Sequence, residues 1–233
     1  MSNSTTNTAL AASFFLGAAV SFLVSNVINK KKTSLNRTNA GATMEGNDLS
    51  LYYGDISQLT TVTQSRKFLP SEVYGKLVRD CVVCCVDCLL VRTSKEGKKE
   101  CLLVLRSSEP VKGVWWLPGG RLLKGESFFA AAKRKAQEET GLTNVTCIQV
   151  LGVWNTFFPT SNWDTDTEKG TQTVNPIVLV ELNDEGADVK LDDTSEEWRW
   201  ISLDPEEAIQ NGEDKYVVQG LLRLQAWNPS YNR

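Results

Sequence analysis

The sequence predicts a layered α/β domain between about Lys67 and Arg233. Short apolar segments separated by turn residues are typical of strands, and they recur throughout this part of the chain. Two stretches, Ser127–Glu139 and Lys215–Trp227, have the character of helices. With 41% hydrophobic and 23% charged residues, the composition is that of an ordinary globular protein. Helices interspersed among strands indicate that helices pack against a sheet.

The predicted elements follow one another with short turns between them. A short helical start at 204–209 separates the last strand from the second helix. In chain order, the strands are expected at 81–91, 98–106, 113–120, 147–154, 175–182 and 196–203.

The first predicted strand holds four of the six cysteines, in the run "CVVCCVDC". Side chains three residues apart on a strand point to opposite faces, so these thiols cannot converge on one metal ion without a turn. No glycine or proline in the run supplies a turn. We therefore expect small thiols packed in a core strand, in a reducing compartment.

The N-terminal part of the chain differs from the rest in composition. Residues 9–28 carry no charge and would span about 30 Å as a helix, the thickness of a bilayer core. Lys30, Lys31 and Lys32 follow directly, and positive charge stays on the cytoplasmic side. This predicts a short tail at 1–8, a single-pass anchor at 9–28, a connector at 29–66 and a cytosolic domain at 67–233. The alternative is a cleaved signal peptide and a location in the secretory lumen.

The net charge of the chain argues against nucleic acid as a binding partner. A net charge of −3 and a pI of about 5.2 give no basic footprint for nucleic acid, so a small or nucleotide-like ligand is expected instead. Histidine is absent, which removes the commonest general base at neutral pH. Catalysis would therefore depend on carboxylates, lysine, arginine or a metal ion.

A glycine turn followed by a helix with two terminal carboxylates predicts a cation site. "LPGG" allows the backbone to turn tightly and to approach a ligand closely. Gly141 ends the helix, so Glu138 and Glu139 lie in its last turn, where the helix dipole reinforces their attraction for a cation. Mg²⁺ prefers such oxygen ligands, with Mn²⁺ as an alternative. A solvated pair of surface carboxylates is the other interpretation.

The spacing of these residues resembles the Nudix box. Gly120 is followed after five residues by Glu126 and after seven more by Arg134, and "AQEETGL" completes the pattern. The resemblance implies an α/β/α sandwich with a mixed sheet, and a hydrolase that uses a divalent metal to cleave nucleoside diphosphate derivatives. One position departs from the pattern, because Lys135 replaces the glutamate that follows the arginine.

Between about Phe68 and Trp200 the chain resembles the GDP-mannose mannosyl hydrolase branch, in which the same glutamate is also missing. That branch cleaves the bond at the anomeric carbon of the sugar. The resemblance to this branch implies that Asp87 contacts the substrate, that Arg106 and Arg121 bind the diphosphate, and that Arg106 also takes part in catalysis. It further implies metal binding by Gly120 and Glu139, joined by Glu138. Glu126 and Arg134 are expected to hold the structure of the box.

The loop before "EEWRW" departs from that branch. The glutamine ligand and the histidine base of the branch correspond to Thr194 and Ser195, and serine is not a base at neutral pH. Glu196 is the predicted replacement base, with Asp193 as an alternative and a surface charge as the simpler interpretation. An ammonium at Lys135 makes a second metal ion unfavourable, so one-metal chemistry is expected.

Three functions remain open from the sequence. The first is hydrolysis of a nucleotide sugar such as GDP-mannose, giving GDP and the free sugar. The second is cleavage of a P–O bond, giving a nucleoside monophosphate. The third is a catalytically silent nucleotide-binding module tethered to a membrane. The oligomeric state is open as well, with a homodimer among the alternatives.

Overall fold

The computed structural model describes residues 69–163, 169–184 and 187–231. The predicted tail, anchor and connector therefore lie outside the described residues. Among the helices of the described residues, none is long and apolar enough to cross a membrane. The helices are α2 (Ser71–Asp80), α3 (Phe128–Thr140), α4 (Pro205–Gln210) and α5 (Lys215–Trp227). The strands are β1 (Val83–Thr93), β2 (Lys99–Arg106), β3 (Trp115–Trp116), β4 (Gly119–Arg121), β5 (Val145–Phe158), β6 (Thr171–Leu182) and β7 (Ser195–Ser202).

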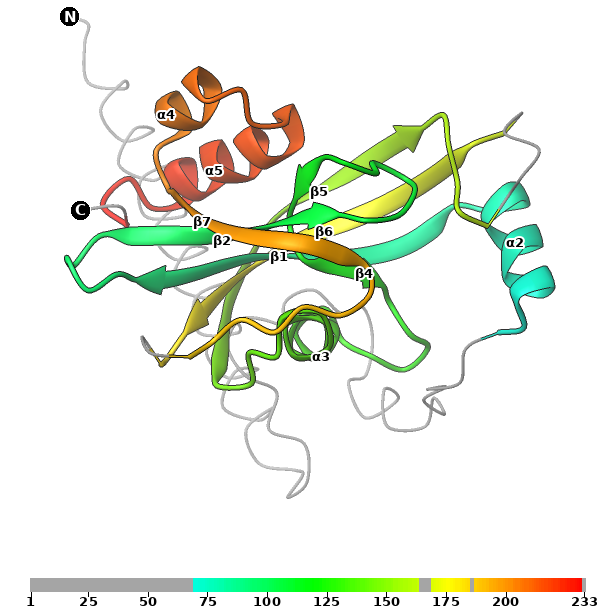
Figure 1. Cartoon of the computed structure of the whole chain (residues 1–233), viewed down its shortest axis with the longest axis horizontal. Helices are drawn as coiled ribbons and strands as arrows, with labels where there is room; N and C mark the ends of the chain where they lie inside the picture. The colour runs from blue at the N-terminus through cyan, green and yellow to red at the C-terminus, as the bar shows by residue number, and fades with distance from the viewer. Residues whose placement is uncertain (1–68, 164–168, 185–186, 232–233) are drawn as a thin grey trace, which may run out of the picture. The chain divides into compact units, whose positions relative to one another are not determined.

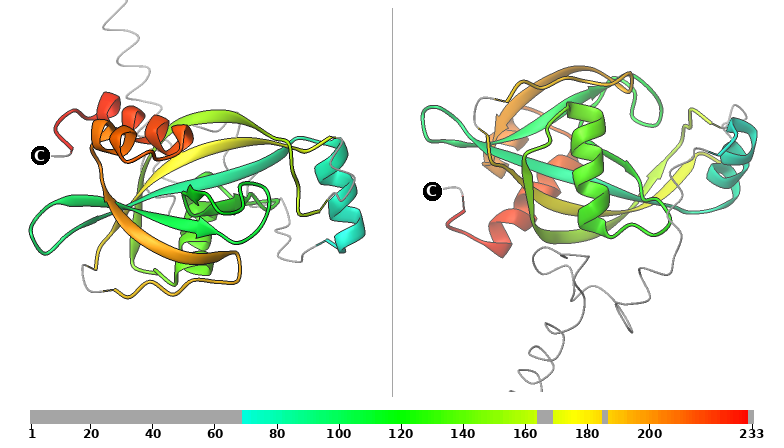
Figure 2. Two further views of the ribbon diagram at one scale, coloured as in Figure 1. Left: turned by 45° about the horizontal axis from the view of Figure 1, so that its top comes forward. Right: turned by 90° about the horizontal axis from the view of Figure 1, so that it is seen from below.

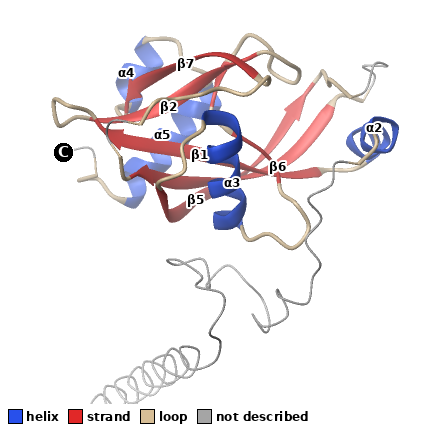
Figure 3. Ribbon diagram, turned by 60° about the horizontal axis from the view of Figure 1, so that its bottom comes forward, coloured by secondary structure: helices blue, strands red, loops and turns tan. Residues whose placement is uncertain are grey.

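The strands form one mixed sheet, as predicted. Its order is β3-β2-β1-β6-β5, with β4 paired to β1 and β7 paired to β2. β1 and β6 run parallel, and the other described pairs are antiparallel. Helix α3 covers one face and α4 and α5 lie on the other, which gives the expected α/β/α layers (Figure 1, Figure 3). Helix α2 lies at the end of the sheet away from α4 (Figure 2).

The alternation of side chains along β1 divides the core into two clusters. Leu89 and Val91 face α5 and pack with Leu221, whereas Cys88 and Leu90 face α3. All five are almost fully buried. Burying both faces of the central strands explains why β1, β2 and β6 are continuous apolar runs.

A serine cap and a glycine in the left-handed conformation set the two ends of helix α3. Ser127 Oγ accepts a hydrogen bond from the Ala130 N–H at 3.0 Å, which caps the first turn. Gly141 takes the left-handed conformation (φ 70°) that ends the helix, as the sequence predicted. This placement brings the last turn of α3 beneath the turn between β3 and β4.

Two expectations are corrected by the structure. No helix was predicted before β1, but Ser71–Asp80 is helical, with Pro70 directly before it. Of the four clustered cysteines only Cys88 is buried: Cys81 precedes β1 and is exposed, Cys84 is exposed near the start of β1, and Cys85 is half-buried. All six cysteines are free thiols.

Candidate functional site

A cavity of about 260 Å³ opens beside the turn between β3 and β4. Its walls come from segments far apart in the chain, since α2, β1, the end of β2, the end of β5 and the start of β6 all contribute. Residues important below that line it are Tyr74, Asp87, Arg106, Trp116, Gly119, Gly120, Arg121, Phe158, Trp163, Thr173, Asn175 and Thr194.

Asp87 is the buried carboxylate of this cavity, with 3% of its surface exposed. Its Oδ2 accepts hydrogen bonds from the Tyr216 hydroxyl at 2.6 Å and from the Asn175 amide at 2.7 Å. Burial raises the pKa of Asp87 to about 6, although these two donors act in the opposite direction. A carboxyl group of this kind changes its protonation state near neutral pH.

Strand geometry explains how Asp87 reaches the cavity. Asp87 lies two residues before Leu89 and shares its face of β1, where Tyr216, in the first turn of α5, meets it. Gly119 lies opposite Asp87 in the pairing of β1 with β4. A Cβ added at Gly119 would lie 2.1 Å from Asp87 Oδ1, so only glycine allows this approach.

Aromatic rings form much of the apolar wall. The Trp116 and Tyr216 rings stack with centroids 4.5 Å apart and an interplanar angle of 1°, and Phe158 meets Trp116 edge-on. At the side of α2, Tyr74 contacts Trp163 edge-on, and the Arg121 guanidinium lies 4.8 Å from the Tyr74 ring centroid. Flat apolar walls with an arginine beside them suit a planar or sugar-bearing ligand with anionic groups.

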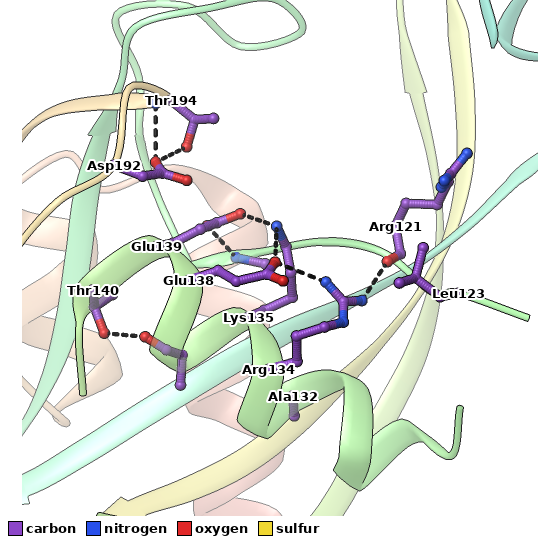
Figure 4. A network of polar contacts seen from close by, with 12 residues as sticks. Arg121, Leu123, Ala132, Arg134, Lys135, Glu138, Glu139, Thr140, Asp192 and Thr194 are labelled. Carbon is purple, nitrogen blue, oxygen red and sulfur yellow. Dashed lines mark hydrogen bonds and ion pairs between the residues drawn. The ribbon is translucent and has the colours of Figure 1, made fainter. Parts of the chain in front are cut away.

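Arg134 organises the start of the neighbouring polar network on α3 (Figure 4). Its guanidinium contacts Glu126 through Nε at 2.6 Å and Nη2 at 2.9 Å, one nitrogen to each carboxylate oxygen. Nη1 donates to Glu138 at 2.8 Å, and Nη2 also donates to the Arg121 carbonyl at 2.9 Å. The two residues predicted as box-structural, Glu126 and Arg134, therefore tie helix α3 to the strand that carries Arg121.

Lys135 lies between the two carboxylates at the end of α3 (Figure 4). Its Nζ is 2.7 Å from Glu139 Oε1 and 3.5 Å from Glu138 Oε2. The other oxygen of Glu139, Oε2, accepts the Gly119 N–H at 2.9 Å. Glu139 is 2% exposed, so a fixed cation and a backbone amide hold this buried carboxylate.

The predicted metal ligands are neighbours, yet as arranged they do not fit a divalent ion. Both oxygens of Glu139 are engaged, and Glu138 Oε2 is shared by Arg134 and Lys135. Mg²⁺ requires near-octahedral oxygen donors at about 2.1 Å. Across the described ranges, no group of three or more Asp, Glu, Cys or His side chains could hold a metal ion. The expectation of one Mg²⁺ bound by Gly120, Glu138 and Glu139 therefore stays a prediction that this donor set does not favour.

The other predicted site residues separate into two groups. Asp87, Arg106 and Arg121 come together as lining residues of the cavity, with Thr194 beside them. Glu196 lies on the exposed part of β7 and does not line the cavity. Its neighbour Ser195 is buried, and its hydroxyl has no hydrogen-bond partner among the described residues.

Sequence reasoning missed the two donors that hold Asp87. Asn175 and Tyr216 are 88 and 129 residues away from Asp87 along the chain. The polar stretch "TQTVN" before the apolar run of β6 is the one local signal, because polar residues at the start of a buried strand indicate a site.

This chain resembles a known family and several known proteins. Residues 85–219 match a family model described as the NUDIX domain. The relative named "Low-salt glycan biosynthesis protein Agl8", from Haloferax volcanii, is 35% identical over 94 residues, which are 40% of this chain and 56% of that protein. The chain thus matches little more than half the length of this relative.

Two solved structures are similar to part of this chain. A crystal structure of a C. elegans Ap4A hydrolase binary complex is 25% identical with a TM-score of 0.50, covering 64% of this chain and 100% of the other. A Nudix hydrolase from M. smegmatis, RenU, is 21% identical with a TM-score of 0.48, covering 63% and 86%.

Proposed function

The chain belongs to the Nudix hydrolase family, and from that premise we propose that it hydrolyses a nucleoside diphosphate derivative, with a nucleotide sugar such as GDP-mannose as the leading substrate. One observation carries the proposal. A single cavity contains two arginines, a glycine turn, aromatic walls and one buried carboxylate held by neutral donors. These groups match the anionic, planar and hydroxylated parts of such a ligand.

Arg106 and Arg121 are proposed to bind the diphosphate. A guanidinium presents a planar fork that can bind phosphate oxygens in pairs. Arg106 comes from the end of β2 and Arg121 from β4, so the two arginines reach the cavity from different strands. Gly119 and Gly120 lack side chains, which leaves room for a ligand to approach the backbone there.

Asp87 is proposed to contact a hydroxyl of the substrate and to accept the proton of the attacking water. In the proposed reaction, water adds to the anomeric carbon, the bond from that carbon to the phosphate oxygen breaks, and GDP leaves with the electron pair. The water proton then passes to a carboxylate. Glu196 was predicted for this step, but the cavity position of Asp87 and its pKa of about 6 favour Asp87.

Family members typically use Mg²⁺ or Mn²⁺. Such an ion would neutralise charge on the leaving phosphate. Because the donors at Glu138 and Glu139 do not fit a divalent ion as they lie, the proposed steps use only the side chains of the cavity.

Two alternatives are supported by specific observations. Likeness to an Ap4A hydrolase supports cleavage of a P–O bond, whereas likeness to a glycan biosynthesis protein supports a nucleotide sugar. The ion pair between Lys135 and Glu139 supports a third function, a nucleotide-binding module without catalysis.

One assay separates these functions. The purified chain is incubated with a panel of nucleotide sugars and dinucleoside polyphosphates, with and without Mg²⁺, and the products are identified. GDP plus free sugar supports the proposal, and a nucleoside monophosphate supports P–O cleavage. Tight binding without turnover supports the silent module, and neither binding nor turnover contradicts all three.

Matched arginine variants test the diphosphate role. Arg121→Ala should weaken binding of the nucleotide by at least about tenfold, since a charge-assisted contact is lost. The control is Arg223→Ala on the exposed side of α5, which should leave binding unchanged. Equal effects of the two substitutions would contradict the assignment of Arg121.

Membrane attachment is a separate proposal, supported only by the sequence of residues 9–28 and the lysines after them. It places the domain in the cytosol, with the secretory lumen as the alternative. Protease protection of the full chain in sealed membranes distinguishes the two. A homodimer likewise stays a prediction, which light scattering would test.

A further inference from the structure

Lys135 occupies a position that the surrounding backbone leaves open for it. A Cβ added at Gly120 would lie 2.6 Å from Lys135 Cε and 3.1 Å from Nζ, so the lysine fills the space that a side chain at Gly120 would need. The side chain is only 15% exposed. Its ammonium is therefore held between the glycine turn and the end of α3.

The charges around Lys135 are already close to balance. Glu126, Arg134, Lys135, Glu138 and Glu139 contribute three negative and two positive charges. A lysine side chain is positively charged at neutral pH, so a divalent ion beside Lys135 would meet repulsion.

The oxygens that a divalent ion would need are committed to other donors. Glu139 Oε1 contacts Lys135 Nζ at 2.7 Å, and Glu139 Oε2 contacts the Gly119 N–H at 2.9 Å. Binding an ion at Glu139 would therefore break a buried ion pair and leave the Lys135 ammonium only its contact with Glu138 at 3.5 Å. Breaking a buried pair in this way is strongly unfavourable.

We infer that the Lys135 ammonium is the resident cation of this site, that it excludes divalent ions from Glu138 and Glu139, and that the chain binds the diphosphate of its ligand without a metal ion there. The identity of the ligand rests on the proposed function, whereas the exclusion of metal does not. Arg106 and Arg121 then carry the positive charge that faces the diphosphate.

Mn²⁺ binding followed by electron paramagnetic resonance tests the exclusion directly. Without nucleotide, the wild-type protein should bind Mn²⁺ no more tightly than the variant Glu139→Gln. Lys135→Glu adds a carboxylate and removes the ammonium, so it should bind Mn²⁺ at least about tenfold more tightly than wild type. The matched control is Lys124→Glu, which makes the same charge change at an exposed lysine before α3 and should gain no site.

Lys135→Gln protects the test against misfolding of Lys135→Glu. It removes the ammonium without adding a carboxylate and should gain weaker Mn²⁺ binding than Lys135→Glu. The inference is overturned if wild type binds one Mn²⁺ as tightly as the Lys135 variants and loses it in Glu139→Gln. A gain in Lys124→Glu equal to that in Lys135→Glu would overturn it as well.

The diphosphate part is measured by calorimetry with GDP in EDTA and in Mg²⁺. The affinity of wild type should differ by less than about threefold between the two conditions, because the fixed charges do not change. Binding of GDP only in Mg²⁺ would overturn the inference. Absence of GDP binding in both conditions would contradict the proposed function, while the Mn²⁺ measurements still decide the role of Lys135.

Discussion

Two buried carboxylates on either side of one glycine turn are held in different ways. Asp87, 3% exposed, receives hydrogen bonds from the neutral groups of Tyr216 and Asn175. Glu139, 2% exposed, receives one from a backbone amide and pairs with the Lys135 ammonium. Neutral donors only partly offset the cost of burying a charge, so the pKa of Asp87 rises to about 6. A carboxylate with neutral donors can exchange a proton, whereas one paired to a cation supplies fixed charge.

The two glycines of the turn each make room for one of these arrangements. Gly119 leaves space for Asp87, and Gly120 leaves space for Lys135. Four predictions break or sharpen the contrast between the Asp87 side and the Lys135 side, and they are ordered by the size of the expected effect.

The largest effect is expected for Gly119→Ala. The added Cβ would lie 2.6 Å from the Val86 carbonyl oxygen and 2.8 Å from Asp87 Cα, and these backbone atoms cannot turn away. Gly119→Ala should lower the free energy of unfolding by about 3 kcal/mol or more, and Gly120→Ala by less, because its Cβ meets the Lys135 side chain and no backbone atom. Urea unfolding of both variants measures the difference. Equal losses would show that the backbone on the Asp87 side can yield.

Lys135→Met should leave Glu139 buried without its cation. We expect a loss of about 3 kcal/mol in the free energy of unfolding at neutral pH in EDTA. The double variant Lys135→Met with Glu139→Gln removes both charges and should recover more than half of the loss. A loss below about 1 kcal/mol for the single variant would mean that Glu139 does not depend on Lys135.

Asp87→Asn should act in the opposite direction on stability. Folding raises the pKa of Asp87 from an ordinary 3.8 to about 6, so its favourable contribution is fully present below about pH 4 and is lost as the pH rises through about 6. Asparagine can accept the same hydrogen bonds without a charge. The free energy of unfolding of the variant, minus that of wild type, should rise by about 2 kcal/mol from pH 4 to pH 8. Urea unfolding of both proteins at each pH measures this difference.

The same substitution should abolish turnover if Asp87 accepts the proton of water. A variant that is no more stable at pH 8 than at pH 4, relative to wild type, would contradict the raised pKa. A variant with full activity would leave the stability argument intact but remove Asp87 from the proposed chemistry.

Tyr216→Phe is expected to have the smallest effect. It removes one of the two donors to Asp87 while keeping the ring that stacks on Trp116. That hydrogen bond lowers the pKa of Asp87, so its loss should raise this pKa further above about 6, at a cost of roughly 1 kcal/mol in stability. Carbon-13 NMR titration of the Asp87 carboxyl measures the shift, and an unchanged pKa would assign the hydrogen-bonding role to Asn175 alone.

The strands and helix α3 were predicted because their signals are local, whereas the mixed sheet was implied by the resemblance to the Nudix family. Apolar runs mark buried strands, and Gly141 marks the end of the helix. Strand β6 was predicted from Asn175 but begins at Thr171, and β5 was predicted to end at Trp154 but continues to Phe158. These additional residues belong to the part of the sheet that lines the cavity, where polar side chains replace the apolar pattern.

Part of the site was predicted from the resemblance to the Nudix family. Asp87, Arg106 and Arg121 stand in recognisable motifs, and the structure brings them to one cavity. The donors Asn175 and Tyr216 lie far from Asp87 along the chain, so no local sequence pattern predicts that they bond to it. The position of Lys135 relative to Glu139 follows from helical spacing, but the closeness of Gly120 depends on how β4 packs on α3.

The Gly119 amide gives the protein a natural reporter. Its proton points at the Glu139 carboxylate, while its own Cα faces Asp87 across the strand pair. A charge-assisted hydrogen bond of this kind moves an amide resonance away from the crowded region of a spectrum. A single peak should therefore record events on both sides of the turn, and nitrogen-15 labelling of glycine alone would be enough to observe it.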